Sequence, residues 1–436
     1  MTQSSSGKRI VIATFGSFGD IHPYIPITHE LKARGHHPVI ATLEGYREKI
    51  ESLGVAFHPV RPDLPRPESP EGAEMMERGM DAKTGSEYII KELIMPYLRA
   101  SFEDIATAAR GADVLITHPI TLTAPLVAQK MRVRWMSSVL APLSFFSAYD
   151  PVAPPVASGI VKLLRLSPVI ARLFVNVVRH TTRRWVEPVQ ELRAELGLSP
   201  DGHPIFEGQH SPTLVLALFS KILGEPQRDW PPNTVVTGFP FYDRRDERQD
   251  GAGLAPELER FLDAGPPPVV FTLGSSAVWT AGDFYRESVA AAKALNCRAV
   301  LLTGDARNLP AGEPLPEGVA AFDYAPFGEL LPRAAVVVHQ GGIGTTAQAL
   351  RAGKPMLVVP FSHDQPDNAA RVTRLGIART LPRQRYNARR AAAELKELMG
   401  NPKHTRGAAE VGRIVRREDG AGAACDAIEK GMRAEG

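Results

Sequence analysis

Residues 336–346 read VVVHQGGIGTT, and this stretch decides the fold. Three valines followed by a glycine-rich turn predict a buried parallel strand, and Thr345 and Thr346 open a segment that predicts a helix ending near Gly353. A strand, a glycine loop and a helix N-terminus together form an anion site, because backbone N–H groups and the helix dipole point at the same spot. His339 at the strand end adds a side-chain donor. No Gly-Lys-Ser/Thr sequence follows, which excludes a Walker phosphate loop.

A second predicted strand, with polar residues just after it, follows the glycine turn along the chain. Residues 355–360 read PMLVVP and predict the next buried strand, and Asp364 and Gln365 lie just past its end. Ligands of open α/β sheets bind at this edge, and a carboxylate beside an amide offers acceptors and donors for sugar hydroxyls. Each feature alone has an ordinary explanation, since His339 could end a strand and Asp364 could begin a helix. The ordered combination predicts a site for a nucleotide sugar.

The stretch from His339 to Gln365 resembles the donor-binding signature of the family 1 glycosyltransferases with the GT-B fold. Its form, His-x-Gly-Gly-x-Gly-Thr-Thr, is similar to that of the sterol glucosyltransferase and bacterial antibiotic and rhamnolipid glycosyltransferase branch. Residues 16–23 (GSFGDIHP) and 31–36 (LKARGH) match the same branch. The resemblance is weak between about residues 60 and 230 and strong from about 320 to 375. It implies an α/β fold of two Rossmann-like, doubly wound parallel-sheet domains that face each other across a cleft.

Length and composition agree with a globular protein of two domains. The chain has 436 residues, which is too many for one core, and 44% of them are hydrophobic. The 51 basic and 48 acidic residues leave a net charge of +3, which gives no basis for nucleic-acid binding. Two cysteines are too few for a disulfide framework, and no apolar run reaches the length of a spanning helix. We therefore expect a cytoplasmic protein, with any membrane contact being peripheral.

Strands alternate with helices in both halves of the chain, which predicts two parallel sheets wound on both faces. The strands expected in the first sheet are residues 9–15, 37–43, 55–60 and 113–117. In the second half, which is expected to begin at about residue 235, the predicted strands are residues 235–238, 268–273, 298–303, 320–322, 335–339 and 356–359. A charged linker at residues 243–253 separates the halves. The expected domains are residues 1–235 for the acceptor, with a helical insert, 236–403 for the donor, and 404–436 as a final helix that by resemblance packs back on the first domain.

The resemblance implies which second-domain residues hold the nucleotide sugar, without a metal or other cofactor. Tyr324, next to Ala325, takes the place of a base-stacking Trp in plant relatives, and a terminal Gln goes with glucose-type donors, which favours UDP-glucose. No Asp-x-Asp sequence occurs, so the metal–diphosphate site of the other major glycosyltransferase fold is absent. The further donor-binding residues are expected to be Gly19 from the first domain and, from the second, Gly274, Ser275, Ser276, His339, Gly341, Gly342, Gly344, Thr345, Thr346, Asp364 and Gln365.

The catalytic base should come from the first domain, because the acceptor hydroxyl must lose its proton as it attacks the anomeric carbon. Plant relatives place a His three residues before the loop Pro, and here Asp20 precedes Pro23 by three, as in the sterol and glycopeptide branch. Asp20 also has an ordinary explanation as a helix N-cap. His22 is the rival, because a histidine titrates closer to neutrality than a carboxylate. His118, after the fourth predicted strand, would orient Asp20 or contact the acceptor.

The sequence says less about the acceptor site. Phe145 and Phe146 precede a helical region, residues 151–198, in which apolar residues are interspersed with Arg165, Arg172, Arg179, Arg183 and Arg184. This region fits a packed helical subdomain with a solvated basic face. It also fits an apolar acceptor pocket whose basic rim touches anionic membrane surfaces. Lipid, sterol, polyketide and phenolic acceptors are all compatible with it.

These features predict an inverting glycosyltransferase that moves a hexose, glucose from UDP-glucose, to a hydroxyl of an apolar acceptor, with Asp20 as the base. A NAD-dependent oxidoreductase is disfavoured, because residues 16–19 lack the G-x-G-x-x-G pattern. The remaining alternative is a catalytically inactive nucleotide-sugar-binding partner or activator protein, and the presence of Asp20 argues against it.

Overall fold

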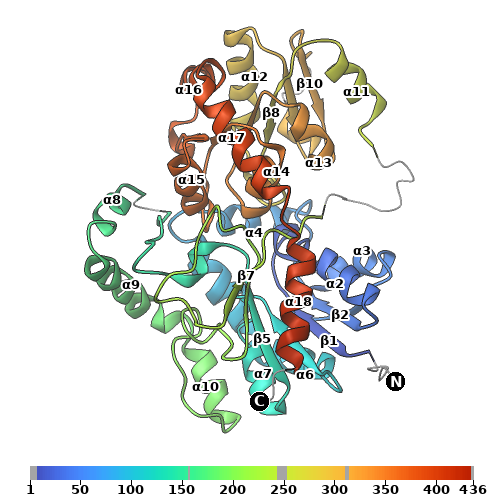
Figure 1. The fold of residues 1–436 in the computed structure, drawn as a ribbon, viewed down its shortest axis with the longest axis vertical. Coiled ribbons are helices and arrows are strands. Elements are labelled where there is room, and N and C mark those ends of the chain that lie inside the picture. Colours follow the sequence, from blue (N-terminus) through green and yellow to red (C-terminus); the bar gives the residue numbers. More distant parts are fainter. Residues whose placement is uncertain (1–6, 156–157, 243–252, 310–313, 434–436) are drawn as a thin grey trace.

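The computed structural model describes residues 7–155, 158–242, 253–309 and 314–433. Two parallel sheets, one above the other along the long axis of the molecule, form its body (Figure 1). Helices cover both faces of each sheet, so the short apolar strands are buried from both sides, as parallel sheets require. The predicted fold class, two doubly wound parallel-sheet units, is confirmed.

The first sheet has seven strands in the order β3-β2-β1-β4-β5-β6-β7. All described pairings in it are parallel, and Ile12 at its centre pairs with Ile40 on one side and Ile116 on the other. The strands are β1 Arg9–Ala13, β2 His37–Thr42, β3 Ala56–Pro59, β4 Val114–Thr117, β5 Arg134–Val139, β6 Val215–Ala217 and β7 Thr234–Val236. The α-helices of this half are α1 Phe18–Ile21, α2 Tyr24–Ala33, α3 Arg47–Ser52, α4 Pro70–Gly79, α5 Gly85–Tyr88, α6 Leu98–Ala108, α7 Ala124–Met131, α8 Val161–Leu164, α9 Pro168–Thr182 and α10 Glu187–Glu195.

The second sheet has six strands in the order β10-β9-β8-β11-β12-β13, again paired in parallel. The strands are β8 Val269–Thr272, β9 Ala299–Leu302, β10 Val319–Phe322, β11 Val336–His339, β12 Met356–Val358 and β13 Ala378–Thr380. The α-helices that follow β7 are α11 Pro256–Asp263, α12 Phe284–Leu295, α13 Phe327–Leu330, α14 Ile343–Ala352, α15 Gln365–Arg374, α16 Ala388–Gly400, α17 Pro402–Val415 and α18 Gly420–Arg433.

Three strands, β5, β6 and β13, were not predicted from the sequence. In β5 two buried serines interrupt the apolar pattern, and tertiary contacts satisfy their hydroxyls. Ser138 Oγ donates to the carbonyl of Thr117 at 2.9 Å, and Ser137 Oγ accepts the Ser211 N–H at 2.8 Å. The other two strands have only three residues each, which is too short for a periodic signal.

The last segment is two helices rather than the single helix expected over about residues 404–434. The chain turns between α17 and α18, and α18 then runs down the first half (Figure 1). Arg34 on α2 bonds Asp426 at 2.6 Å, and Arg134 on β5 donates to the carbonyl of Gly431 at 2.7 Å. The C-terminal helix therefore packs against the first sheet's helices. Of the linker predicted at 243–253, residues 243–252 lie outside the described residues.

Each sheet has one point at which its strand order reverses. In the first sheet this point lies between β1 and β4, and in the second it lies between β8 and β11. The loops that leave two such neighbouring strands run in opposite directions and open a crevice at the carboxyl edge, where ligands of this architecture bind. The residues singled out by the sequence follow these four strands.

Candidate active site

Asp20 and His118 lie together at the reversal point of the first sheet. Asp20 belongs to α1, which follows β1, and His118 is the residue directly after β4. The Nε2 atom of His118 is 3.4 Å from Oδ1 of Asp20. The side chain of His118 is only 5% exposed, whereas that of Asp20 is 31% exposed. The carboxylate is therefore the member of the pair that a substrate can reach.

The loop after β1 is shaped around this carboxylate. The backbone N–H of Ser17 donates to Oδ2 of Asp20 at 2.7 Å, and the Ser17 hydroxyl lies 3.1 Å from the same oxygen. Ser17 is the N-cap of α1, and Asp20 completes its capping box from the third helical position. At Gly16, with φ of 128°, a Cβ would lie 2.3 Å from Oδ2, so the loop needs glycine there. Oδ2 is thus held by the loop, and Oδ1 faces His118.

His22 points away from this pair. Its ring packs on Phe18 and on Tyr242, with ring centroids 5.1 Å apart in both cases. Burial, with a smaller effect of the Lys49 charge, lowers the pKa of His22 to about 3. The His22 ring is thus enclosed by aromatic side chains, whereas the Asp20 carboxylate is partly exposed, so the contacts favour Asp20 over its rival.

In the second half, α14 begins directly after the glycine turn that ends β11. Gly342 is the N-cap and offers no side-chain bond, which leaves the N–H groups of the first turn available to an anion. Gly344 lies exposed in this first turn, and Thr345 is buried beside it. The Thr346 hydroxyl donates to the carbonyl of Gly342 at 2.9 Å, so it stabilises the helix start.

His339, the last residue of β11, is fully buried at the base of this turn. Its Nδ1 accepts the N–H of Gly341 at 3.1 Å, which places the ring proton on Nε2. Among the described residues, nothing hydrogen-bonds to that Nε2. Burial lowers the pKa of His339 to about 3, so the ring can supply a hydrogen bond but no positive charge.

The loop after β8 meets the loop after β11. A Cβ at Gly274, where φ is 64°, would lie 2.3 Å from Nε2 of Gln340 and 3.2 Å from the hydroxyl of Thr345. Ser275 next to it is exposed, and Ser276 is half-buried. The two glycine turns expected to face a diphosphate therefore lie side by side at the second reversal point.

Asp364 and Gln365 follow β12 and begin α15. The amide of Asn368 donates to Oδ2 of Asp364 at 2.7 Å and to the carbonyl of Gly341 at 2.9 Å, so it links the loop after β12 to the glycine turn after β11. Burial raises the pKa of Asp364 to about 7; the Asn368 bond opposes this rise and the charge of Asp20 adds to it. The side-chain carbonyl of Gln365 accepts the N–H of Phe361 at 2.9 Å, which leaves its amide N–H groups as the donors for a ligand.

The remaining predicted residues occupy less informative positions. Tyr324 is half-buried and Ala325 is buried, in the loop after β10 on the same carboxyl edge. Gly19 lies within α1, and its N–H donates to the Ser17 hydroxyl at 3.2 Å. The structure gives these residues no contact that by itself indicates a ligand.

The two carboxyl edges face each other. The charge of Asp20, in the first half, raises the pKa of Asp364, in the second. Beside them, the hydroxyl of Ser86 lies 3.0 Å from Nδ1 of His363. On another side, the N–H of Ala153 donates to Asp367 at 2.9 Å. The Asp20 carboxylate of the first half therefore lies near the loop that follows β12 in the second half.

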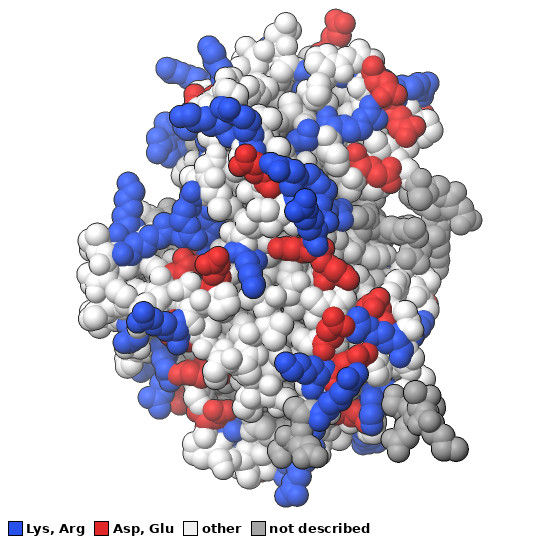
Figure 2. Space-filling model, viewed as in Figure 1, with Lys and Arg blue, Asp and Glu red and all other residues white. Residues whose placement is uncertain are grey.

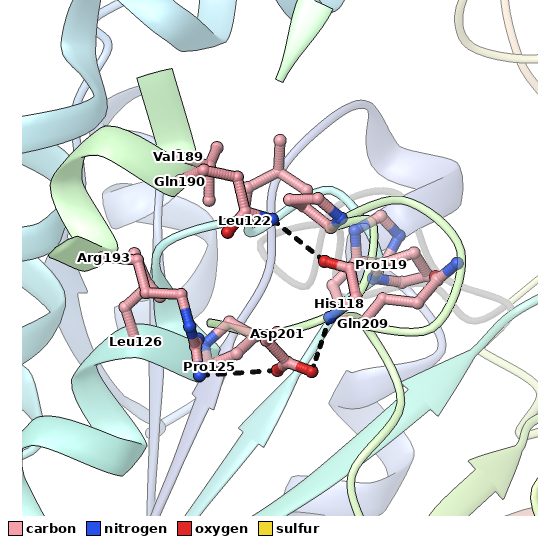
Figure 3. A pocket seen from close by; sticks show the side chains of 13 residues that line it. His118, Pro119, Leu122, Pro125, Leu126, Val189, Gln190, Arg193, Asp201 and Gln209 are labelled. Carbon is pink, nitrogen blue, oxygen red and sulfur yellow. Dashed lines mark hydrogen bonds and ion pairs between the residues drawn. The ribbon is translucent and has the colours of Figure 1, made fainter. Parts of the chain in front are cut away.

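A hollow in the first half opens beside His118 (Figure 3). Its wall is largely apolar, and the ion pair between Arg193 and Asp201, at 3.6 Å, closes one end. The apolar wall is made by Pro119, Leu122, Pro125, Leu126, Val189 and Pro204. Of the two predicted acceptor residues, Phe145 is instead part of the core, where it stacks on Trp230 with ring centroids 4.0 Å apart. Phe146 is half-buried and packs on Phe206.

Comparison with known proteins identifies the family. Residues 10–138 match the glycosyltransferase family 28 N-terminal domain, and residues 287–421 match the erythromycin biosynthesis protein CIII-like C-terminal domain. The chain is 33% identical, over 97% of both chains, to the O-mycaminosyltylonolide 6-deoxyallosyltransferase of Streptomyces fradiae. The chain belongs to the GT-B glycosyltransferases of the antibiotic and sterol branch. The predicted family is confirmed.

Other relatives of this glycosyltransferase agree with that assignment. It is 28% identical to a sterol 3-beta-glucosyltransferase of Cryptococcus neoformans, over 97% of this chain but 27% of that longer protein. Among solved structures, the glycosyltransferase of kitacinnamycin superposes with a TM-score of 0.66 at 24% identity, covering 98% of this chain and 99% of that one. VinC in complex with DTDP gives 0.67 at 18% identity, covering 98% and 100%. These structural likenesses support the fold.

Asn368 was not predicted from the sequence, yet it contacts two of the predicted residues. Asn368 is fully buried, one helical turn after Asp364, and ties that carboxylate to Gly341. The spacing of four residues on a helix was the signal that could have identified it, since side chains so spaced lie on one face. Among the residues that the structure describes, no group of three or more His, Cys, Asp or Glu is placed to hold a metal ion. Within the same ranges, no helix is long and apolar enough to span a bilayer.

Proposed function

We propose that this glycosyltransferase transfers a hexose, glucose from UDP-glucose, to a hydroxyl of an apolar acceptor with inversion at the anomeric carbon and without a metal. One observation carries the proposal. Asp20, the accessible member of its pair with His118 at the reversal point of the first sheet, lies close enough to Asp364 in the second half for its charge to raise the pKa of that residue. A base in one half and an anion site in the other suit a displacement that takes a proton on one side and releases a diphosphate on the other.

The donor would lie on the second half. Its diphosphate would accept hydrogen bonds from the first-turn N–H groups of α14 and from Nε2 of His339, and the helix dipole would stabilise the negative charge that grows as it leaves. The sugar hydroxyls would bond Asp364 and the amide of Gln365. In this arrangement the leaving group is stabilised by fixed dipoles and neutral donors.

The reaction is a single displacement. Oδ1 of Asp20 takes the proton of the acceptor hydroxyl while its oxygen forms a bond to the anomeric carbon. The bond between that carbon and the diphosphate oxygen breaks, and the diphosphate leaves with the electron pair. Ser17 and His118 hold the carboxylate in place, so little reorganisation is needed as the proton moves.

The apolar body of the acceptor would occupy the hollow beside His118 (Figure 3). A second hollow lies on the other side of Leu122 and is also mainly apolar, lined by Thr14, Phe15, Ile94, Ile105 and Ile120 among others. The two hollows share Leu122, so apolar surface flanks the loop that follows His118. The relatives named above act, by their names, on O-mycaminosyltylonolide and on sterols.

The test is transfer assayed by mass spectrometry with UDP- and dTDP-sugars and with phenolic, sterol, macrolide and hydroxy-lipid acceptors. Gain of one hexose by an acceptor is expected with UDP-glucose. Asp20→Asn should lower kcat by about 10² to 10⁴, the usual contribution of a general base, while nucleotide affinity stays within twofold, or about 0.4 kcal/mol.

Asp113→Asn is the matched control. Asp113 lies at the opposite end of β4, where it pairs with Lys8 at 3.0 Å, and its loss should leave kcat unchanged. Full activity of Asp20→Asn would overturn the assignment of the base. A protein that binds nucleotide sugars but transfers nothing to any acceptor would contradict the proposed reaction.

A further inference from the structure

Helices α8 and α9 carry a row of large aliphatic side chains that face solvent. Leu166 is 75% exposed, Val169 72% and Leu173 65%, and Leu163 and Val177 extend the row at both ends. On α9, steps of four residues place Val169, Leu173 and Val177 on one face. Leu163 lies on α8, and Leu166 lies in the turn between the two helices. We call this row, Leu163, Leu166, Val169, Leu173 and Val177, the aliphatic stripe.

The fold does not need this stripe for its own packing. The opposite side of α9 supplies the residues that dock the helix, with Ala171 buried and Ile170 and Phe174 packed with it against Ala148 and Leu164. Helix α9 is therefore apolar on two sides, and only one of them packs against the rest of the protein. Contiguous exposed apolar surface of this kind marks a contact with another phase or partner.

The segment that carries the stripe is basic. Between Pro151 and Val186 the sequence has six basic residues and no Asp or Glu. The basic residues are Lys162, Arg165, Arg172, Arg179, Arg183 and Arg184. In Figure 2 the surface over α9, at the left edge, is uncharged and is bordered above and below by Lys and Arg. Glu207 pairs with Arg179, but the remaining excess of basic residues favours an anionic partner.

The composition of the stripe distinguishes between anionic partners. Contact centres between proteins are enriched in Trp, Tyr and Arg, whereas the five residues of the stripe are Leu and Val only. Aliphatic side chains beside Lys and Arg are typical of helices that lie in the plane of a membrane interface, where the aliphatic groups enter the acyl region and the cations meet the headgroups.

The stripe lies close to the cleft. Arg165 lies between α8 and α9. It is close enough to Asp150, Asp367, Arg371 and Arg374 for their charges to act on its guanidinium group. Three of these residues belong to α15, the helix that begins at Gln365 beside the candidate sugar site. A surface that held α9 would therefore sit next to the space between the two halves.

We propose that the aliphatic stripe and its basic border bind the surface of an anionic lipid bilayer, with α9 lying in the interface plane. This binding is reversible and peripheral, and it does not depend on the proposed function. It rests on the exposed stripe, the excess of basic residues in its segment and the absence of aromatic residues from the stripe.

The test is co-sedimentation of the full chain with vesicles of phosphatidylcholine alone and of phosphatidylcholine mixed with phosphatidylglycerol. Binding is expected to the mixed vesicles and to weaken as salt rises. The variant Lys162→Glu/Arg172→Glu/Arg184→Glu should bind at least about 100-fold more weakly, since each cation near an anionic surface contributes about fivefold. The variant Leu166→Ser/Val169→Ser/Leu173→Ser should lose the binding that persists at high salt.

Matched controls come from α16 and α17. Arg389→Glu/Lys396→Glu also reverses exposed cations, and Met399→Ser/Ile414→Ser also removes exposed apolar side chains. Both should bind vesicles as the parent does, and all four variants should keep the parent's Tm. Lack of binding to mixed vesicles at low salt would overturn the proposal. So would equal losses in the test and control variants, or a dimer in light scattering that the triple Ser variant converts to monomer.

Discussion

Asp150 and Arg371 form an ion pair that joins the two halves of the molecule. Asp150 follows β5 of the first sheet, and Arg371, only 2% exposed, lies on α15 of the second half. Arg371 also donates to Asp367 at 2.6 Å, and Asp367 accepts the N–H of Ala153 at 2.9 Å. Since α15 begins at Gln365, this buried network fixes the helix of the candidate sugar site against the first half of the molecule.

Replacing Asp150 by Ala should lower the free energy of unfolding by about 3 kcal/mol, because breaking a buried pair leaves a desolvated guanidinium with less compensation. Chemical denaturation followed by fluorescence measures it. Arg374 contacts the same carboxylate at 3.2 Å but is 40% exposed, so Arg374→Ala should cost less than about 1 kcal/mol. Equal losses in the two variants would contradict a special role for the buried pair.

Gly16→Ala should reduce kcat more than nucleotide affinity. The new Cβ would meet Oδ2 of Asp20 at 2.3 Å with φ of 128°, so the loop must shift and move the base. A loss of about tenfold or more in kcat is expected from a displacement of this kind. Gly35 also has a positive φ, 84°, but has no atom within 4 Å of its Cβ position, so Gly35→Ala is the control. Both substitutions introduce strain, but only the first should lower the rate.

Donor affinity should depend on pH through Asp364. Burial raises the pKa of this carboxyl to about 7 in the free protein. The ionised carboxylate accepts hydrogen bonds from sugar hydroxyls at both oxygens. Protonation turns one of these oxygens into an O–H donor, so fewer hydroxyls can donate to the side chain. The Kd for the nucleotide sugar should therefore fall as pH rises through 7 and level off above it, as calorimetry can show.

Asp364→Asn supplies the comparison for that experiment. Its side chain is neutral throughout, so the step in affinity near pH 7 should vanish while any dependence from other groups stays. A step of unchanged size in the variant would assign the titration to another residue.

Asn368→Ala should weaken donor binding and move the step in affinity to higher pH. Its amide lowers the pKa of Asp364, so removing the amide lets the pKa rise further. The loss also leaves the Gly341 carbonyl without this donor, at a cost of about 1 to 3 kcal/mol in stability. Asn308→Ala is the control, because that amide also bridges two carbonyls, those of Val278 and Thr303. It should cost similar stability without moving the pH step.

Strong local patterns made much of the fold predictable. The valines of β11, the glycine turn after it and the helix that follows are contiguous in the chain, and each sets its own backbone preference. The same holds for β1 and the loop to Pro23. The polar strand β5 escaped prediction because the partners of its two buried serines, Thr117 and Ser211, lie elsewhere in the sequence.

In the candidate site, too, some residues could be predicted from the sequence, whereas their contacts depend on the fold. Asp20 and His118 could be named from the sequence, yet their 3.4 Å approach depends on the parallel pairing of β1 with β4. Phe145 was expected at the acceptor and instead packs on Trp230, a contact between segments far apart in sequence. Asn368 was not identified, since one amide is a weak signal until the fold places Gly341 beside it.

The sequence by itself determined the family, the two-sheet class and the residues that follow the key strands, because these follow from short-range patterns of apolar residues and glycine. The tertiary structure decided which of those residues meet. It set the pairing of Asp20 with His118, the neutral state of His339 and the raised pKa of Asp364. It also set the ion pair between Asp150 and Arg371 that joins the two halves. Burial and distance set these properties, and both arise only when segments far apart in the sequence are packed together.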